Sequence, residues 1–139
     1  MAEPPVIWSE GTTRLLDYGT GEAGQPVLFI PSLINKSYIL DLARKRSLMR
    51  DLARRGFRPL LVDWGAPGQR ESSFSLDDYI AGRLARALEA TYNLNSQPVA
   101  IVGYCMGGTL AMGLAAIRAE LLSAMVLMAT PWDFHAMDP

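Results

Sequence analysis

The sequence of 139 residues is poor in reactive side chains, with a single cysteine and a single histidine. One cysteine cannot form an internal disulfide, so Cys105 is either an inert buried thiol or a chemically active one. The sequence also lacks an excess of positive or negative charge, because it contains 13 basic and 14 acidic residues. This balance gives no field that would gather polyanions, and we expect no nucleic-acid partner.

Long hydrophobic runs are absent as well. The longest weakly polar run, from Met106 to Ile117, is far shorter than the roughly 20 residues that span a bilayer. No basic N-terminal stretch leads into an apolar signal region. We therefore expect a cytoplasmic protein without a transmembrane segment. Half of the residues are apolar and 19% are charged, which favours elements buried on both faces.

Buried strands alternate with helices from Val27 onwards. The expected strands are 27–30, 59–63, 99–102 and 123–129, and the expected helices are 47–55, 75–92 and 107–117. Gly56 should end the first helix, and Ser75 with Asp78 should cap the start of the second. The second helix carries an apolar stripe formed by Leu76, Ile80, Leu84 and Leu88. This rhythm predicts an α/β fold, with a mostly parallel central sheet and helices on both faces.

A glycine-rich run follows the first expected strand, 12–18. Its pattern Gly19-x-Gly21-x-x-Gly24 is that of a dinucleotide fingerprint, but a strand follows it where a helix would be needed. We interpret the run, which extends to Pro26, as the turn of an antiparallel hairpin.

The strongest motif is Gly103-Tyr104-Cys105-Met106-Gly107-Gly108, placed between a strand and an alanine-rich helix. This is the pattern of a nucleophile elbow with cysteine as the nucleophile. Gly103 and Gly107 lack side chains, so strand and helix can approach closely. The start of the helix favours a thiolate at Cys105.

An acyl group attacked by this thiolate would need donors for the developing oxyanion. The backbone N–H of Met106 is the first candidate. The second should come from Ser32, Leu33 or Ile34 in the loop after strand 27–30, and we favour Leu33 by its position in that loop. The acyl group of a thioester stays reactive on a cysteine, which favours acyl transfer over hydrolysis.

Several further stretches carry a resemblance to a known family. They are Ile34-Asn35-Lys36, Tyr38-Ile39-Leu40-Asp41-Leu42, Val62-Asp63-Trp64-Gly65, Ser75-Leu76-Asp77-Asp78-Tyr79-Ile80 and Thr130-Pro131-Trp132-Asp133-Phe134. Together with the elbow they resemble the catalytic subunit of polyhydroxyalkanoate synthases, which have an α/β-hydrolase fold. The resemblance covers roughly residues 27 to 135.

This resemblance implies an acyltransferase that polymerises 3-hydroxyacyl-coenzyme A through a thioester on Cys105, on the surface of polyester granules. Coenzyme A would be the leaving group, with no metal or redox cofactor. It also implies a second synthase subunit or a homodimer as partner. The Asp and His that complete the family's catalytic triad have no matching position here. We therefore expect an incomplete, inactive N-terminal half of one domain, truncated after about the sixth strand.

Two other functions stay open. The same fold could hydrolyse esters or thioesters, or the chain could be a non-catalytic half-domain that binds a partner through the edge strand 123–129. Other candidates have ordinary explanations that we prefer. His135 could be a catalytic base but is better explained as a loop histidine, and Asp63 or Asp133 could be a triad acid but is better explained by a turn. A basic run could bind coenzyme A phosphates but is better explained as a solvated helix face, namely Arg44-Lys45-Arg46 with Arg50, Arg54 and Arg55. Three aromatic residues are equally suited to an acyl pocket or to loop packing, namely Trp64, Trp132 and Phe134.

Overall fold

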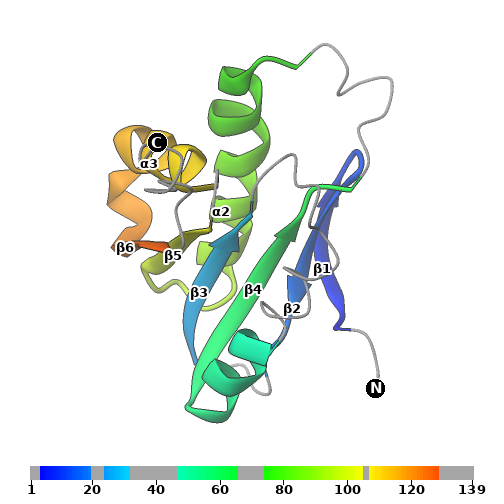
Figure 1. Ribbon diagram of the computed structural model, residues 1–139, viewed down its shortest axis with the longest axis vertical. Coiled ribbons are helices and arrows are strands. Elements are labelled where there is room, and N and C mark those ends of the chain that lie inside the picture. Colours follow the sequence, from blue (N-terminus) through cyan, green and yellow to red (C-terminus); the bar gives the residue numbers. More distant parts are fainter. Residues whose placement is uncertain (1–3, 20–23, 32–46, 66–73, 105–106, 129–139) are drawn as a thin grey trace, which may run out of the picture.

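The computed structural model describes residues 4–19, 24–31, 47–65, 74–104 and 107–128 (Figure 1). Its centre is a six-stranded sheet with the order β1-β2-β4-β3-β5-β6. The strands are β1 (Val6–Glu10), β2 (Thr13–Asp17), β3 (Gln25–Ile30), β4 (Phe57–Asp63), β5 (Val99–Tyr104) and β6 (Leu122–Met128).

Four of these strands, β4, β3, β5 and β6, run parallel to one another. An antiparallel hairpin of β1 and β2 joins them, because β2 pairs antiparallel with β4. The predicted mostly parallel sheet is confirmed. The sequence analysis missed β1, although Val6, Ile7 and Trp8 are typical of a strand.

Helices cover both faces of the sheet, as expected (Figure 1). One face carries α3 (Gly107–Ile117) and a long helix that starts at residue 76 and contains the π-helix η2 (Asp78–Leu84) and α2 (Ala85–Asn93). The other face carries the helix 47–54, and a short 3₁₀ turn, η3 (Ala119–Leu121), precedes β6. Within the described ranges, no helix is long and apolar enough to cross a bilayer.

Two hydrophobic cores result from the alternation of side chains along the strands. On β3, Leu28 and Ile30 face the core that also contains Leu84 and Leu114, from the long helix and α3. The intervening residues of β3, Val27 and Phe29, face a smaller core, which includes Met49 of helix 47–54. Thus β3 is buried on both faces.

The ends of two helices follow the predictions. The Asp78 carboxylate accepts the Ser75 N–H at 2.8 Å, and the Ser75 hydroxyl accepts the Asp78 N–H at 3.2 Å. This is the expected reciprocal cap. Gly56 ends the helix 47–54 with a φ of 94°, and its N–H donates to the Ala53 carbonyl. Such a left-handed φ favours glycine.

The predicted apolar stripe is wrong at its first residue. Leu84 and Leu88 are completely buried and Ile80 packs against the same core, but Leu76 is 50% exposed. A period of four residues assumed regular α-helical turns. The π-helix η2 has wider turns, so the stripe does not extend in a straight line to the first residue of the helix.

The interpretation of the glycine-rich run as a hairpin turn is also wrong. β2 and β3 are not neighbours, because β4 lies between them and pairs with both. The connection from Gly19 to Gly24 therefore crosses from one side of β4 to the other, and residues 20–23 within it lie outside the described part.

The last described strand, β6, forms one edge of the sheet, as predicted. Three of its apolar residues, Met125, Val126 and Leu127, are 40–47% exposed. The expected bounds of this strand, 123–129, differ from the observed ones by a single residue at each end.

Candidate functional site

The junction between β5 and α3 is packed so closely that it excludes side chains at two positions. A Cβ atom on Gly103 would lie 2.7 Å from the Gly108 Cα atom, and one on Gly107 would lie 1.9 Å from the Ile30 carbonyl oxygen. Real Cβ atoms do not approach backbone so closely, so both positions require glycine. Close approach of β5 and α3 is the role expected of both glycines; Gly103 has this role, whereas Gly107 lies against the end of β3.

Only two residues separate β5 from α3, and they are the predicted nucleophile, Cys105, and the predicted oxyanion donor, Met106. Both lie outside the described residues, as does Leu33, the second predicted donor. Their roles therefore stay predictions. What the structure describes is the scaffold on either side of them.

The end of β3 is the second part of this scaffold. Its carbonyl at Ile30 lies against the first residue of α3, and the next carbonyl, that of Pro31, accepts the indole N–H of Trp64 at 3.0 Å. Trp64 follows directly after β4 and is 7% exposed. Parallel strands β3, β4 and β5 end at one edge, where ligands of such sheets commonly bind.

Asp63, the last residue of β4, closes a turn, as predicted. One of its carboxylate oxygens accepts the N–H of Gly65 at 3.1 Å, and the other accepts an N–H of Arg14 at 2.6 Å. Gly65 has a φ of 68°, and a Cβ atom there would lie 2.3 Å from the Thr12 carbonyl oxygen. Both partners of Asp63 are thus structural.

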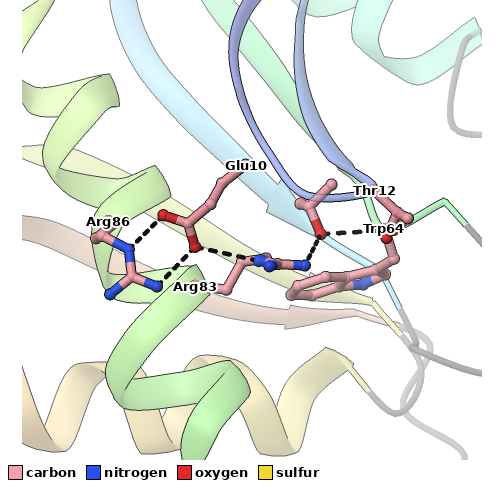
Figure 2. Close-up of polar contacts among 6 residues, drawn as sticks. Glu10, Thr12, Trp64, Arg83 and Arg86 are labelled. Carbon is pink, nitrogen blue, oxygen red and sulfur yellow. Dashed lines mark hydrogen bonds and ion pairs between the residues drawn. The ribbon is translucent and has the colours of Figure 1, made fainter. Parts of the chain in front are cut away.

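A chain of polar contacts leads from Trp64 to the surface of the long helix (Figure 2). The hydroxyls of Thr12 and Thr13 donate to the Trp64 carbonyl at 3.1 and 3.4 Å. Arg83 donates to the Thr13 hydroxyl at 3.3 Å and to the carboxylate of Glu10 at 3.2 Å. Arg86 donates twice to the same carboxylate, at 2.5 and 2.6 Å.

This arrangement buries a cation. The Arg83 side chain is 1% exposed, and its guanidinium carbon lies 4.9 Å from the centre of the Phe74 ring. The hydrogen bond from Arg86 lowers the pKa of Glu10 below its ordinary value, against the effect of burial, and Arg83 contributes to the same shift. Glu10 in turn raises the pKa of Arg86. Glu10 is therefore an anion between two arginines at neutral pH.

The sequence analysis did not find this network. The missed strand β1 supplies Glu10, and Arg83 was assigned only to a helix between two residues of the apolar stripe. Its position next to Leu84, with Ile80 one turn before, is a weak signal of burial, since arginine is seldom buried without a partner.

The remaining candidates divide into two groups. Trp64 belongs to the larger core, as its packing alternative predicted. Arg54, at the end of helix 47–54, and Arg55, just after it, are exposed and form ion pairs with Asp51, so this part of the basic run is solvated. The other candidates lie outside the described residues, namely residues 44–46 of the basic run, Trp132, Asp133, Phe134 and His135. Among the described residues, no cluster of His, Cys, Asp and Glu could hold a metal ion.

The comparison with known families agrees with this architecture. Residues 25–139 match the family described as alpha/beta hydrolase fold, which is most of the chain. The chain belongs to the alpha/beta hydrolase family. Its junction of β5 and α3 is the place where this hydrolase fold would carry a nucleophile.

Relatives with similar sequences include polymerase subunits. The chain is 35% identical, over 89% of its length, to the poly(3-hydroxyalkanoate) polymerase subunit PhaC of Haloferax mediterranei. It is 32% and 36% identical, over 96% of its length, to the PhaC subunits of Allochromatium vinosum and Cupriavidus necator. It spans 26%, 39% and 24% of these three relatives, in the order given. The predicted resemblance to this synthase subunit is confirmed.

Solved structures of alpha/beta hydrolases show the same fold. The crystal structure of a carboxylesterase from the ammonia-oxidizing thaumarchaeon Nitrososphaera gargenis superposes with a TM-score of 0.62 at 21% identity. That match covers 88% of this chain and 44% of the carboxylesterase. The hydrolase GrgF of a Penicillium species superposes with a TM-score of 0.64 at 20% identity, covering 83% of this chain and 40% of GrgF.

Proposed function

We propose that the protein is a cysteine acyltransferase that polymerises 3-hydroxyacyl-coenzyme A, with Cys105 as its nucleophile. The observation that carries the proposal is the packing on either side of this cysteine: Gly103 brings β5 close to α3, and Gly107 brings the start of α3 against the end of β3. The similarity to the PhaC subunits supplies the substrate class.

The first half of the proposed reaction moves the acyl group onto the enzyme. The Cys105 thiolate attacks the thioester carbonyl of the substrate, and the backbone N–H groups of Met106 and Leu33 stabilise the oxyanion that forms. The carbon–sulfur bond to coenzyme A then breaks, and coenzyme A leaves as a thiolate. One thioester has replaced another, so this step needs no oxidant and no metal.

The second half extends the polyester. The hydroxyl of a 3-hydroxyacyl group attacks the enzyme-bound thioester, forms an ester, and frees the Cys105 thiolate. A base must accept the hydroxyl proton. By the resemblance this base is a histidine held by an aspartate, and we expect both at positions beyond the matching stretches of this sequence. We propose that turnover needs those two residues, together with the granule surface and a second synthase subunit or a second copy of the protein.

The assignment of Cys105 as nucleophile can be tested with the complete protein. The protein is incubated with 3-hydroxybutyryl-coenzyme A, and the release of free thiol is followed with a chromogenic thiol reagent. We expect Cys105→Ala to lower the rate of coenzyme A release by at least about a thousandfold, since removal of a nucleophile abolishes the covalent route. Equal release by wild type and Cys105→Ala would refute the assignment. Cys105→Ser is the conservative companion variant.

Hydrolysis is the alternative, favoured by the solved structures of hydrolases with this fold. Product analysis separates the two reactions. Polymer that sediments and depolymerises to 3-hydroxybutyrate supports the synthase, whereas soluble free acid as the sole product supports a hydrolase.

A further inference from the structure

The peptide groups that leave β3 are constrained from two sides. A Cβ atom on Gly107 would lie 1.9 Å from the Ile30 carbonyl oxygen and 2.9 Å from the Pro31 carbonyl carbon, so α3 begins in direct contact with this backbone. From the other side, the indole of Trp64 donates to the Pro31 carbonyl. Pro31 has no N–H of its own, so a carbonyl contact is the one backbone hydrogen bond by which its position can be fixed.

Trp64 is itself held at both ends. Its carbonyl accepts hydrogen bonds from the hydroxyls of Thr12, in the turn between β1 and β2, and Thr13, the first residue of β2. Its ring meets the Tyr79 ring edge-on, with centroids 5.6 Å apart. An indole N–H is a donor in a fixed direction, because the ring has few rotatable bonds. Fixing the backbone and the ring plane of Trp64 therefore fixes the direction from which Pro31 is held.

The contact made by Thr13 depends on Arg83. The Thr13 hydroxyl donates to Trp64 and accepts from Arg83, so its single hydrogen has one direction to point. Glu10 then holds Arg83 from the far side (Figure 2). Burying a charged pair seldom stabilises a fold more than an apolar pair of the same size would. Such a pair does fix geometry, since a displaced buried charge loses its partners.

We infer that Trp64 is a positioning residue: its indole N–H, held in place by Thr13 and Arg83, sets the backbone at Pro31 against the start of α3. The inference rests on the proposed function, in which the donor of Leu33 follows two residues after Pro31 and that of Met106 directly precedes α3. The oxyanion develops only as the transition state forms. The N–H groups that donate to it should therefore affect kcat more than KM.

The test compares two indoles in the complete protein. Trp64→Phe keeps the aromatic packing and removes the N–H, and Trp8→Phe is the matched control, since Trp8 packs against the same core from β1. With 3-hydroxybutyryl-coenzyme A, Trp64→Phe should lower kcat about tenfold at unchanged KM, because small misplacements of reacting groups are costly. Trp8→Phe should retain wild-type kcat. The alkylation rate of Cys105 by iodoacetamide, which needs no oxyanion, should stay the same in both.

A second readout is independent of turnover. Amide hydrogen exchange of the peptide that follows Pro31 should be faster in Trp64→Phe than in wild type, and unchanged in Trp8→Phe. If the thiol-release experiment refutes Cys105 as nucleophile, this exchange measurement still decides whether Trp64 holds the backbone. The proposed function and the inference therefore fail separately.

A second pair of variants covers the case in which Trp64→Phe does not fold. Thr13→Val removes the hydroxyl between Arg83 and Trp64, whereas Thr13→Ser retains it. We expect faster exchange after Pro31 and a lower kcat in Thr13→Val, with rescue in Thr13→Ser. Equal exchange and equal kcat in the two, or in Trp64→Phe and Trp8→Phe, would overturn the inference. So would a loss of kcat matched by an equal loss of Cys105 alkylation, which would indicate general damage.

Discussion

Two buried arginines lie at opposite ends of the parallel strands and differ in what they hold. Arg58, near the start of β4, donates twice to one oxygen of Asp17 on β2, at 2.8 and 3.2 Å, and the other oxygen of Asp17 accepts the Gly19 N–H. This pair fastens two neighbouring strands and ends there. Arg83, near the carboxyl ends, is part of a chain that continues through Thr13 and Trp64 to Pro31. The same ion-pair chemistry fastens strands at one end and positions backbone at the other.

The largest loss of stability should come from breaking the ion pair of Arg58 and Asp17, at the amino ends of the parallel strands. Asp17→Ala leaves Arg58, which is 8% exposed, without its anion, and we expect the free energy of unfolding to fall by about 4 kcal/mol. Urea denaturation measures it. Asp51→Ala is the control, because its ion pairs with Arg54 and Arg55 are exposed and should be worth about 0.5 kcal/mol or less.

The kcat of Asp17→Ala tests whether the two ends of the parallel strands differ in their effect on the site. Per folded molecule, Asp17→Ala should retain the wild-type kcat, because its pair lies away from the edge formed by Pro31, Trp64 and α3. A kcat reduced as strongly as in Trp64→Phe would show that both ends of the sheet govern the site alike.

The next largest effect should come from Gly107→Ala at the carboxyl end. Its Cβ atom would collide with the Ile30 carbonyl, so α3 must move away from β3, at a cost of about 3 kcal/mol and with loss of activity. Gly113→Ala, in the same helix, is the control. A Cβ atom on Gly113 would lie 2.7 Å from the terminal Cδ1 of Ile80 and 3.3 Å from its Cγ2, which are side-chain atoms that can shift more easily than backbone. That control should be neutral or slightly stabilising, because alanine favours helix more than glycine does. Equal thermal unfolding of the two variants would contradict the assigned contact.

A smaller effect is expected from Glu10→Gln, which keeps the shape of the side chain and removes its charge. Both oxygens of Glu10 accept from arginine, whereas a glutamine amide has one acceptor oxygen, so at least one arginine N–H loses its partner. We expect a loss of about 2 kcal/mol in urea denaturation. Unlike Asp17→Ala, this variant should also speed amide exchange after Pro31. Unchanged amide exchange would mean that the ion pairs of Glu10 do not contribute to the positioning of Trp64.

Local sequence signals predicted much of the fold. The bounds of α3 were correct, because glycines mark its start and alanines its course. The reciprocal cap of Ser75 and Asp78 was correct because all of its atoms lie within one turn. The burial of β3 on both faces follows from a continuous apolar run between parallel neighbours.

Contacts between distant segments were beyond the same reasoning. The position of β4 between β2 and β3 depends on pairings such as Arg14 with Asp63, 49 residues apart, and no local pattern encodes them. Trp64 was identified as a candidate, but its bond to Pro31 spans 33 residues. The burial of Arg83 likewise depends on Glu10, 73 residues away, in a strand that the sequence analysis missed.

The smallest effect is the pH dependence carried by Glu10. Its hydrogen bond to Arg86 holds the pKa of this carboxyl below the ordinary value of 4.5 in the folded protein, whereas the unfolded chain titrates near that value. The stabilisation is therefore fully present above pH 4.5 and is lost as the pH falls through the lower pKa of the folded state. Because Arg86 is 50% exposed, solvent screens the interaction, and we expect less than about 1 kcal/mol. Urea denaturation of wild type and Arg86→Gln should show a shallower loss of stability below pH 4.5 in the variant. Parallel curves for the two proteins would mean that Arg86 does not set the pKa of Glu10, and that Arg83 alone anchors this end of the network.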